Sequence, residues 1–136
     1  MARGDDIEER LIEFAVRIIT VCNELTDNPA KRHIRGQMLR SRTSPAPNYG
    51  EARGAESGKD FLHKLKIVLK ELNETRIWLK IIIRAEFIPG TRLKPLLDEC
   101  DQLCRIISAS IQTATKTKKI NHSQAVPFTA IHKFTN

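Results

Sequence analysis

Two long helical patterns in this chain are joined by a proline-bent segment, LRSRTSPAPNYGEA at residues 39–52, which is followed by KDFLHKL at residues 59–65. An ordinary helix would not contain prolines at positions 45 and 47, because each removes a backbone donor and crowds the preceding turn. The segment therefore predicts that the second helix is kinked or interrupted, with a further helical turn from Asn48 to Arg53. Ser57 and Asp60 then resemble a capping box, although Asp is shorter than the preferred Glu, and predict the start of the next helix.

Apolar residues on both sides of this segment recur at spacings of three and four, which is typical of amphipathic helices. We expect a first helix capped by Asp5 and Asp6 and ending near Thr26, and a second that starts at Pro29. A third spans residues 58–87, and a fourth fades near Thr115. No strand pattern or internal repeat is present. The fold class predicted is all-α, an antiparallel up-down-up-down four-helix bundle over residues 1–115 with a kinked second helix and a flexible C-terminal tail over residues 116–136.

The third helix is apolar on two faces. Leucines form one stripe, whereas Ile67, Trp78, Ile81 and Ala85 lie on the opposite side at about 100° per residue. A four-helix bundle covers only one face of each helix, so the second face predicts contact with another subunit.

The composition says less about the function of the protein than about its fold. The 136 residues carry a formal charge of +7, and the excess lies in residues 28–80, with twelve bases against five acids. Solvated helix faces or a surface for polyanions would both explain this excess. Cys100 and Cys104 share a helix face among leucines and are interpreted as small core residues. The acidic N-terminus and the absence of a long apolar run predict a reduced, cytoplasmic protein with no membrane contact.

Basic side chains are the best candidates for a binding role, because Lys and Arg neutralise phosphates with little sequence information. Only Tyr49 lies near them as a stacking aromatic, so RNA would be bound by backbone and shape. The alternative is a protein-interaction scaffold whose basic surface docks an acidic protein partner. The candidate nucleic-acid-binding residues are Lys31, Arg32, Arg35, Arg42, Lys64, Lys66 and Lys70.

The order and spacing of several short motifs resemble the bacterial four-helix-bundle proteins encoded in intervening sequences of large-subunit ribosomal RNA genes. The resemblance covers about residues 8–115. A related family is the bundle subunit that assists the reverse transcriptase of diversity-generating retroelements. The matching positions are Gln37, Leu39-Arg40-Ser41, Thr43-Ser44, Asn48, Glu51-Ala52, Lys59-Asp60-Phe61, Lys64-Leu65, Lys70-Glu71, Glu74-Thr75 and Trp78-Leu79.

The resemblance implies a homopentamer without catalytic activity, with RNA or a nucleic-acid-processing protein as partner. The prolines at 45 and 47 depart from the family, which usually has an unbroken helical stretch there. Arg40 and Glu74 suggest a polar contact in which an arginine satisfies a carboxylate at a helix or subunit contact. The full set of structural polar and interface candidates is Arg40, Asn48, Glu51, Glu74, Ile67, Trp78 and Ile81.

No catalytic, metal or cofactor site is predicted. Asp60 and His63 have the spacing of one carboxylate-histidine metal motif, but a di-metal bundle needs two copies and further carboxylates. The glycines at 54 and 58 do not form a phosphate loop, because the spacing is one residue short and no strand precedes them. We therefore expect a non-enzymatic protein.

Overall fold

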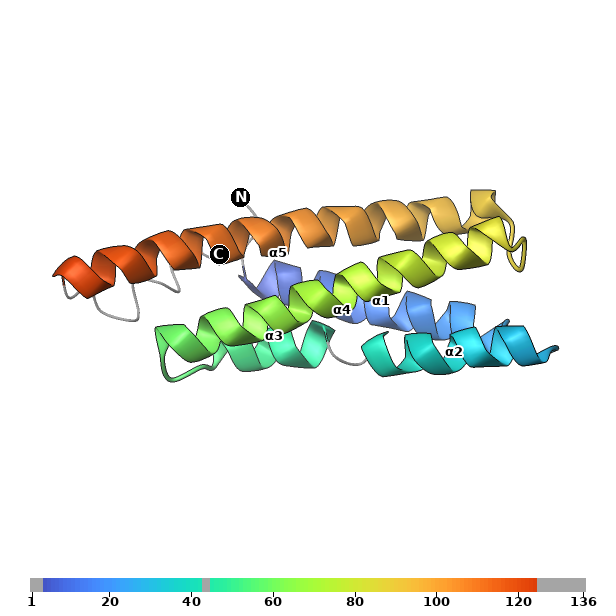
Figure 1. Cartoon of the computed structure of the whole chain (residues 1–136), viewed down its shortest axis with the longest axis horizontal. Helices are drawn as coiled ribbons and strands as arrows, with labels where there is room; N and C mark the ends of the chain where they lie inside the picture. Colours follow the sequence, from blue (N-terminus) through green and yellow to red (C-terminus); the bar gives the residue numbers. More distant parts are fainter. Residues whose placement is uncertain (1–3, 43–44, 125–136) are drawn as a thin grey trace.

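The computed structural model describes residues 4–42 and 45–124, with side chains described at 4–40 and 45–117. Its helices are α1 (Gly4–Asn23), α2 (Pro29–Arg42), α3 (Pro45–Arg53), α4 (Gly58–Arg84) and α5 (Gly90–Gln124), and the described residues contain no strand. Figure 1 shows an elongated bundle in which α2 and α3 follow one another and together fill one position beside α4. The predicted all-α four-helix bundle with an interrupted second helix is confirmed.

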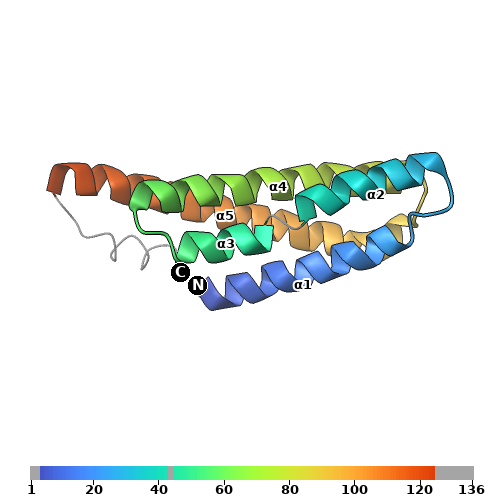
Figure 2. The same cartoon turned by 90° about the horizontal axis from the view of Figure 1, so that it is seen from below.

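The helices occupy the corners of a square. α1 packs on α2, α3 and α5, and α4 packs on the same three helices. Figure 2 shows α1 and α4 on opposite sides of the bundle, with α2 and α3 in front and α5 behind. Since α1 and α4 both run antiparallel to α5, they point in the same direction.

Local chemistry explains where α2 and α3 begin. The Asn28 side chain accepts a hydrogen bond from the backbone N–H of Lys31 at 2.8 Å, which caps α2 one residue before Pro29. Pro45 and Pro47 are the first and third residues of α3. The first four N–H groups of a helix have no partner within the helix, so neither proline removes a hydrogen bond there. The two prolines therefore start a new helix.

The two ends of α4 differ in how clearly the sequence marks them. Asp60 donates its backbone N–H to the Ser57 hydroxyl at 3.1 Å, which confirms the predicted cap. The helix ends at Arg84, three residues before the predicted end. Glu86 has a φ of 58°, and Phe87 donates to the Ile82 carbonyl at 3.1 Å. This is a Schellman ending with Glu at the position that normally carries glycine, so the sequence lacked the usual stop signal.

The last helix is longer than the periodicity suggested, because α5 continues past Thr115 to Gln124. The buried positions beyond Ile107 are Ser110, Ala114 and Thr117. They keep the helical spacing but are small or polar, so the apolar pattern fades while the packing continues. Thr117 donates its hydroxyl to the Thr113 carbonyl at 2.9 Å, which satisfies this polar group within the helix. Residues 125–136 of the predicted tail lie outside the described part of the chain.

The core is aliphatic and continuous along the bundle. At the edge where α1 meets α5, the Arg10 guanidinium donates two hydrogen bonds to the Glu99 carboxylate, at 3.1 and 2.6 Å. A second pair, Arg92 with Glu24 at 2.7 Å, closes the other end of the same edge. The largest fully buried side chains are Phe61, Ile7, Leu11, Ile18, Leu25, Met38, Leu65, Leu72, Leu79, Ile82, Leu103 and Ile107.

Candidate nucleic-acid and subunit interfaces

Helix α2 carries five basic residues and no acid in fourteen positions. Arg32 and Arg40 are exposed, and Arg35 is half-buried. Arg32 donates to the Thr26 carbonyl at 3.2 Å, and neither Arg32 nor Arg35 forms an ion pair with another described residue. Arg42 closes the helix, but its side chain lies outside the described part. We call the surface made by Arg32, Gly36 and Arg40 the α2 ridge.

Gly36 at the centre of the α2 ridge is not required by anything within the chain. A Cβ added there would meet no atom within 4 Å, and no described glycine has a positive φ. A glycine inside a helix costs about 0.5–1 kcal/mol relative to alanine. Gly36 therefore lowers the stability of α2, and the packing of the bundle does not explain why glycine stands there instead of alanine.

Two of the predicted binding residues are already neutralised. Lys31 lies 2.9 Å from Asp27 and 5.4 Å from the centre of the Phe87 ring, and its side chain is only 17% exposed. Lys64 lies 2.9 Å from Glu51, whose side chain is 59% exposed. This contact raises the pKa of Lys64, chiefly through the hydrogen bond to Glu51. Neither lysine is as available to an external phosphate as the sequence alone suggested.

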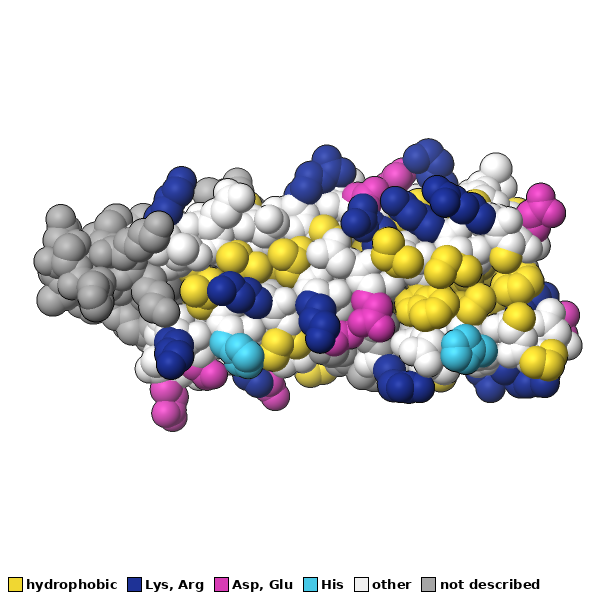
Figure 3. All heavy atoms as spheres, in the orientation of Figure 1, with side chains coloured by type: hydrophobic (Ala, Val, Ile, Leu, Met, Phe, Trp, Pro, Cys, Tyr) yellow, Lys and Arg dark blue, Asp and Glu magenta, His cyan; other side chains and the backbone are white. Residues whose placement is uncertain are grey.

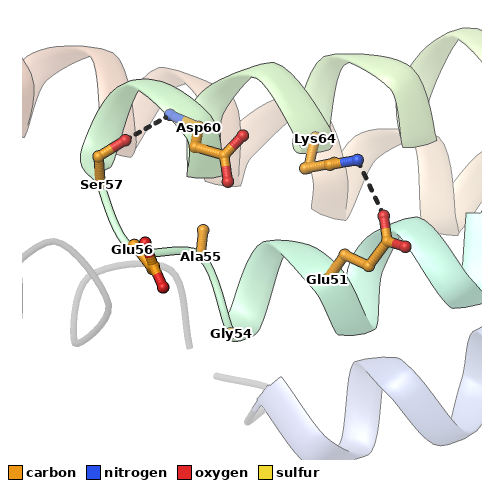
Figure 4. A pocket seen from close by; sticks show the side chains of 7 residues that line it. All are labelled: Glu51, Gly54, Ala55, Glu56, Ser57, Asp60 and Lys64. Atoms are coloured by element: carbon orange, nitrogen blue, oxygen red, sulfur yellow. Dashed lines mark hydrogen bonds and ion pairs between the residues drawn. The ribbon is translucent and has the colours of Figure 1, made fainter.

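The surroundings of Lys64 are acidic as well. An open hollow of about 730 Å³ lies at the turn from α3 to α4, and its lining includes the carboxylates of Glu51, Glu56 and Asp60. Figure 4 shows Glu51 directed at the Lys64 ammonium group and Glu56 further away, at the turn itself. With three carboxylates and one ammonium group in its lining, this hollow disfavours a polyanion. Its other lining residues are Gly54, Ala55 and Ser57.

Lys66 and Lys70 lie on the exposed outer side of α4, away from the α2 ridge. Lys80 and Arg84 continue the same side toward the end of α4, and the sequence analysis did not single them out. No ion pair fixes any of the four within the described part of the chain. In the orientation of Figure 3, Lys and Arg side chains gather along the upper edge, where α4 meets α5. The predicted basic set is therefore divided between two surfaces.

The second apolar face of α4 is present and remains partly uncovered in one chain. Ile77 is 50% and Ile81 38% exposed, and Ile67 and Trp78 are half-buried beside them. The Trp78 ring meets His33 of α2 edge to face, with 6.3 Å between the ring centres. Figure 3 shows these hydrophobic side chains as a patch over the second half of α4, where it runs beside α2. We call Ile77 and Ile81 the α4 stripe.

A matching stripe on α1 was missed from the sequence. Ile12, Val16 and Ile19 are 42%, 49% and 43% exposed, and their spacing of four and three places them on one line. Each of the three lies one or two positions after a buried core residue. The sequence pattern of the core residues therefore masked the second apolar line on the same helix. We call these three residues the α1 stripe.

The two stripes lie on opposite corners of the bundle, on helices that both contact α5. Arg10 of α1 contacts Glu99, and Arg76 of α4 lies 3.8 Å from Asp101, so both reach the same turn of α5. The α1 stripe begins two residues after Arg10, and the α4 stripe begins one residue after Arg76. The two helices run in the same direction, so both stripes extend from this part of α5 toward the C-terminal ends of α1 and α4.

The charges beside the stripes are opposite. Glu9 and Glu13 are exposed next to the α1 stripe, whereas Lys70 and Arg84 are exposed next to the α4 stripe. Glu74 is also exposed on α4, so it needs no partner within one chain. The predicted contact of an arginine with Glu74 stays a prediction for a subunit interface. Asn48 is half-buried on α3, and Glu51 serves the pair with Lys64.

The cysteines follow the prediction in part. Cys100 is fully buried and directs its thiol to the Leu72 carbonyl at 3.3 Å, whereas Cys104 is half-buried with its sulfur 3.7 Å from Asn73 Oδ1. The neighbouring Cys100 thiol lowers the pKa of Cys104, burial opposes this, and the charge of Arg76 assists it. Among the described residues, no group of three or more His, Cys, Asp or Glu side chains could hold a metal ion.

Fold and surface together define a small helical bundle with one basic helix that contains no acid, α2, and two partly uncovered apolar stripes. No helix in the described ranges is long and apolar enough to cross a membrane. The family model of the 23S rRNA-intervening sequence proteins matches residues 5–109, and the chain belongs to this family.

A solved structure supports the assignment. It is a protein of unknown function from the S23 ribosomal protein family of Bacteroides thetaiotaomicron VPI-5482, 34% identical, with a TM-score of 0.72. The similarity covers 77% of this chain and 97% of that one. A comparison with curated proteins found no match.

Proposed function

We propose that this protein is a non-catalytic, homo-oligomeric bundle that binds RNA, or a ribonucleoprotein, through the α2 surface. The observation that carries the proposal is the composition of α2, five bases without an acid, with Arg32 and Arg40 exposed. Phosphates bind such a surface by charge, and repetition in an oligomer multiplies weak contacts. Lys66 and Lys70 serve the subunit contact in this proposal.

The oligomer is proposed to form head to tail, with the α1 stripe of one copy on the α4 stripe of the next. The supporting observations are the opposite corners, the shared direction of α1 and α4 and the opposite flanking charges. Two different patches in contact generate a ring when the rotation closes. The family resemblance suggests five copies in that ring.

The energetics favour closure over open chains. Burying an exposed aliphatic side chain fully is worth about 1.5–3 kcal/mol, so five half-exposed ones contribute about 5 kcal/mol per contact. Association costs about 4–15 kcal/mol, so one such contact is weak. A ring has as many contacts as copies and one more than an open chain, which stabilises the closed form.

Light scattering of the intact protein tests the assembly. The wild-type chain should have several times its 15.5 kDa mass. V16E and I81K should each be monomeric, and V16E combined with I81K in one chain should recover the ring, because the new opposite charges meet across the contact. A109E on the exposed side of α5 is the control and should assemble normally. A monomeric wild type, or single variants that keep the full mass, would reject the head-to-tail contact.

Binding to a structured RNA, followed by fluorescence anisotropy over a salt series, tests the RNA role. Charge reversal of Arg32, Arg35 and Arg42 should abolish binding, and wild-type affinity should fall steeply with salt. The matched control reverses three exposed α5 bases, Lys94, Arg105 and Lys116, and should bind. If the wild type shows no RNA affinity at low salt, the protein is instead a scaffold for an acidic protein partner.

A further inference from the structure

Arg76 has fewer polar partners than its burial requires. Its guanidinium lies 3.8 Å from the Asp101 carboxylate, which is longer than a hydrogen bond, and 33% of its side chain is exposed. Its Nε atom is the one buried side-chain nitrogen or oxygen of the described residues that has no hydrogen-bond partner. A buried donor without an acceptor is costly and rare in folded proteins. The edge of α4 that carries Arg76 therefore needs an acceptor that the described part of this chain does not supply.

Lys80 lies on the same edge of α4, one turn after Arg76. It is half-buried and forms no ion pair within the described part of the chain. Because it follows Arg76 by four residues and Ile77 by three, it stands between the side of α4 that faces α5 and the α4 stripe. Two cations with unused donors thus border the α4 stripe on its α5 side.

An exposed carboxylate borders the α1 stripe at the equivalent position. Glu13 lies three residues after Arg10, which contacts α5, and three residues before Val16. It therefore stands between the side of α1 that faces α5 and the α1 stripe. Glu13 forms no ion pair with any residue in the described ranges. On the α5 side of the stripes, α1 thus presents an acid and α4 presents bases.

These positions decide how two copies can face each other. α1 and α4 run in the same direction within one chain, so two copies that point the same way bring the α5 sides of both stripes together (Figure 2). Glu13 then meets Lys80 and Arg76. If the copies pointed in opposite directions, Glu13 would instead face the other edge of α4, where the exposed Glu74 lies beside Trp78. Like charges in contact disfavour this packing.

Resting on the proposed function, in which copies assemble head to tail, we infer that the Glu13 carboxylate of one copy binds Lys80 and Arg76 of the next. This contact makes neighbouring copies point in the same direction. The apolar stripes supply the buried area, and the ion pair selects the orientation, because charge complementarity sets specificity more than affinity. The partner for this surface is a second copy of the chain in one defined orientation.

Charge reversal tests the pairing, with assembly measured by light scattering over a dilution series. E13K and K80E should each raise the concentration at which the assembly dissociates by about tenfold, because like charges then meet. E13K combined with K80E in one chain should restore assembly, whereas E13K combined with K116E on exposed α5 should not. Melting curves of the same samples establish that each variant is folded. A wild-type oligomer that neither single reversal weakens would overturn the inference and leave the proposed function intact.

A double-mutant cycle tests Arg76 separately, since Arg76 also lies near Asp101 in its own chain. R76Q should weaken assembly of the wild type, and it should weaken assembly much less in E13Q, where the carboxylate is already absent. Equal losses in both backgrounds would overturn the role of Arg76 in the contact.

Crosslinking tests the orientation. In a C104S background, E13C with K80C treated with a short bismaleimide should give covalent multimers on a denaturing gel faster than E13C with E74C. The two members of each pair lie on opposite corners of one chain, so a short reagent links them only between copies. Faster crosslinking of E13C with E74C, or equal rates, would overturn the inferred direction while leaving the head-to-tail contact. A monomeric wild type would reject the proposed function itself.

Discussion

Tyr49 offers a direct test of how α3 is packed. It is the single tyrosine of the chain and is only 2% exposed, although it lies on a short helix between two breaks. Burial raises its pKa to about 12, and the nearby carboxylates of Glu8 and Asp5 act in the same direction, partly opposed by Arg53. The phenol therefore stays protonated in the folded protein at a pH where it ionises in the unfolded chain.

The size of the effect follows from the two pKa values. A tyrosine in an unfolded chain has a pKa of about 10. Below that pH both states hold the proton and the full stability is present. As the pH rises from about 10 to about 12 only the unfolded state loses the proton, so the free energy of unfolding decreases by about 3 kcal/mol, at 1.36 kcal/mol per pKa unit.

Tyrosinate absorbance in the near ultraviolet measures this titration without interference from other tyrosines. Denaturant unfolding of wild type and Tyr49→Phe over the same pH range measures the linked stability, and the difference between them isolates Tyr49 from lysines that titrate nearby. We expect the wild type to lose about 3 kcal/mol more than the variant. Tyrosinate that forms near pH 10 while circular dichroism still reports a full helix content would show that α3 does not cover the ring, and would refute the packing described above.

Three further predictions concern stability and reactivity. Glu86→Gly should stabilise the protein by about 1 kcal/mol, because glycine adopts a φ of 58° without the cost that a Cβ imposes, whereas Glu86→Ala should bring no gain in a thermal melt. Leu72→Ala should reduce the free energy of unfolding by about 3 kcal/mol, since Leu72 is fully buried, and a loss below 1 kcal/mol would argue against this core. Iodoacetamide should modify Cys104 before Cys100, and Cys100→Ala should slow the reaction at Cys104 by removing the neighbouring thiol that lowers its pKa. Peptide mass spectrometry over a pH series measures these rates, and equal labelling of both thiols would contradict the arrangement.

The sequence predicted the parts of the fold that depend on neighbours along the chain. The caps at Asn28 and Ser57 are local contacts over three residues, so residue type and spacing were sufficient to place them. The double proline indicated a break for the same reason. The end of α4 was misplaced because Glu86 adopts a glycine conformation that its residue type does not favour.

The candidate sites depend on partners far apart in the sequence, and there the prediction was weaker. Lys64 looked available until the fold brought Glu51 of α3 beside it. The α1 stripe was invisible as a binding surface, because one helix read by itself does not show which side the bundle leaves uncovered. Only the positions of α2, α3 and α5 around α1 reveal that Val16 faces outward.

The diagonal placement of α1 and α4 has a consequence for any ring built from their stripes. In each copy, the corners formed by α1 and α4 would contact the neighbouring copies. The other two corners would then form the two exposed walls of the ring, one made of α2 with α3 and the other of α5. α5 contains acids as well as bases, with pairs such as Lys94 with Asp98 and Arg92 with Glu24, whereas α2 contains no acid of its own. In such an assembly the positive charge of one wall would be concentrated at α2, whereas the turn from α3 to α4 in the same wall would keep its carboxylates.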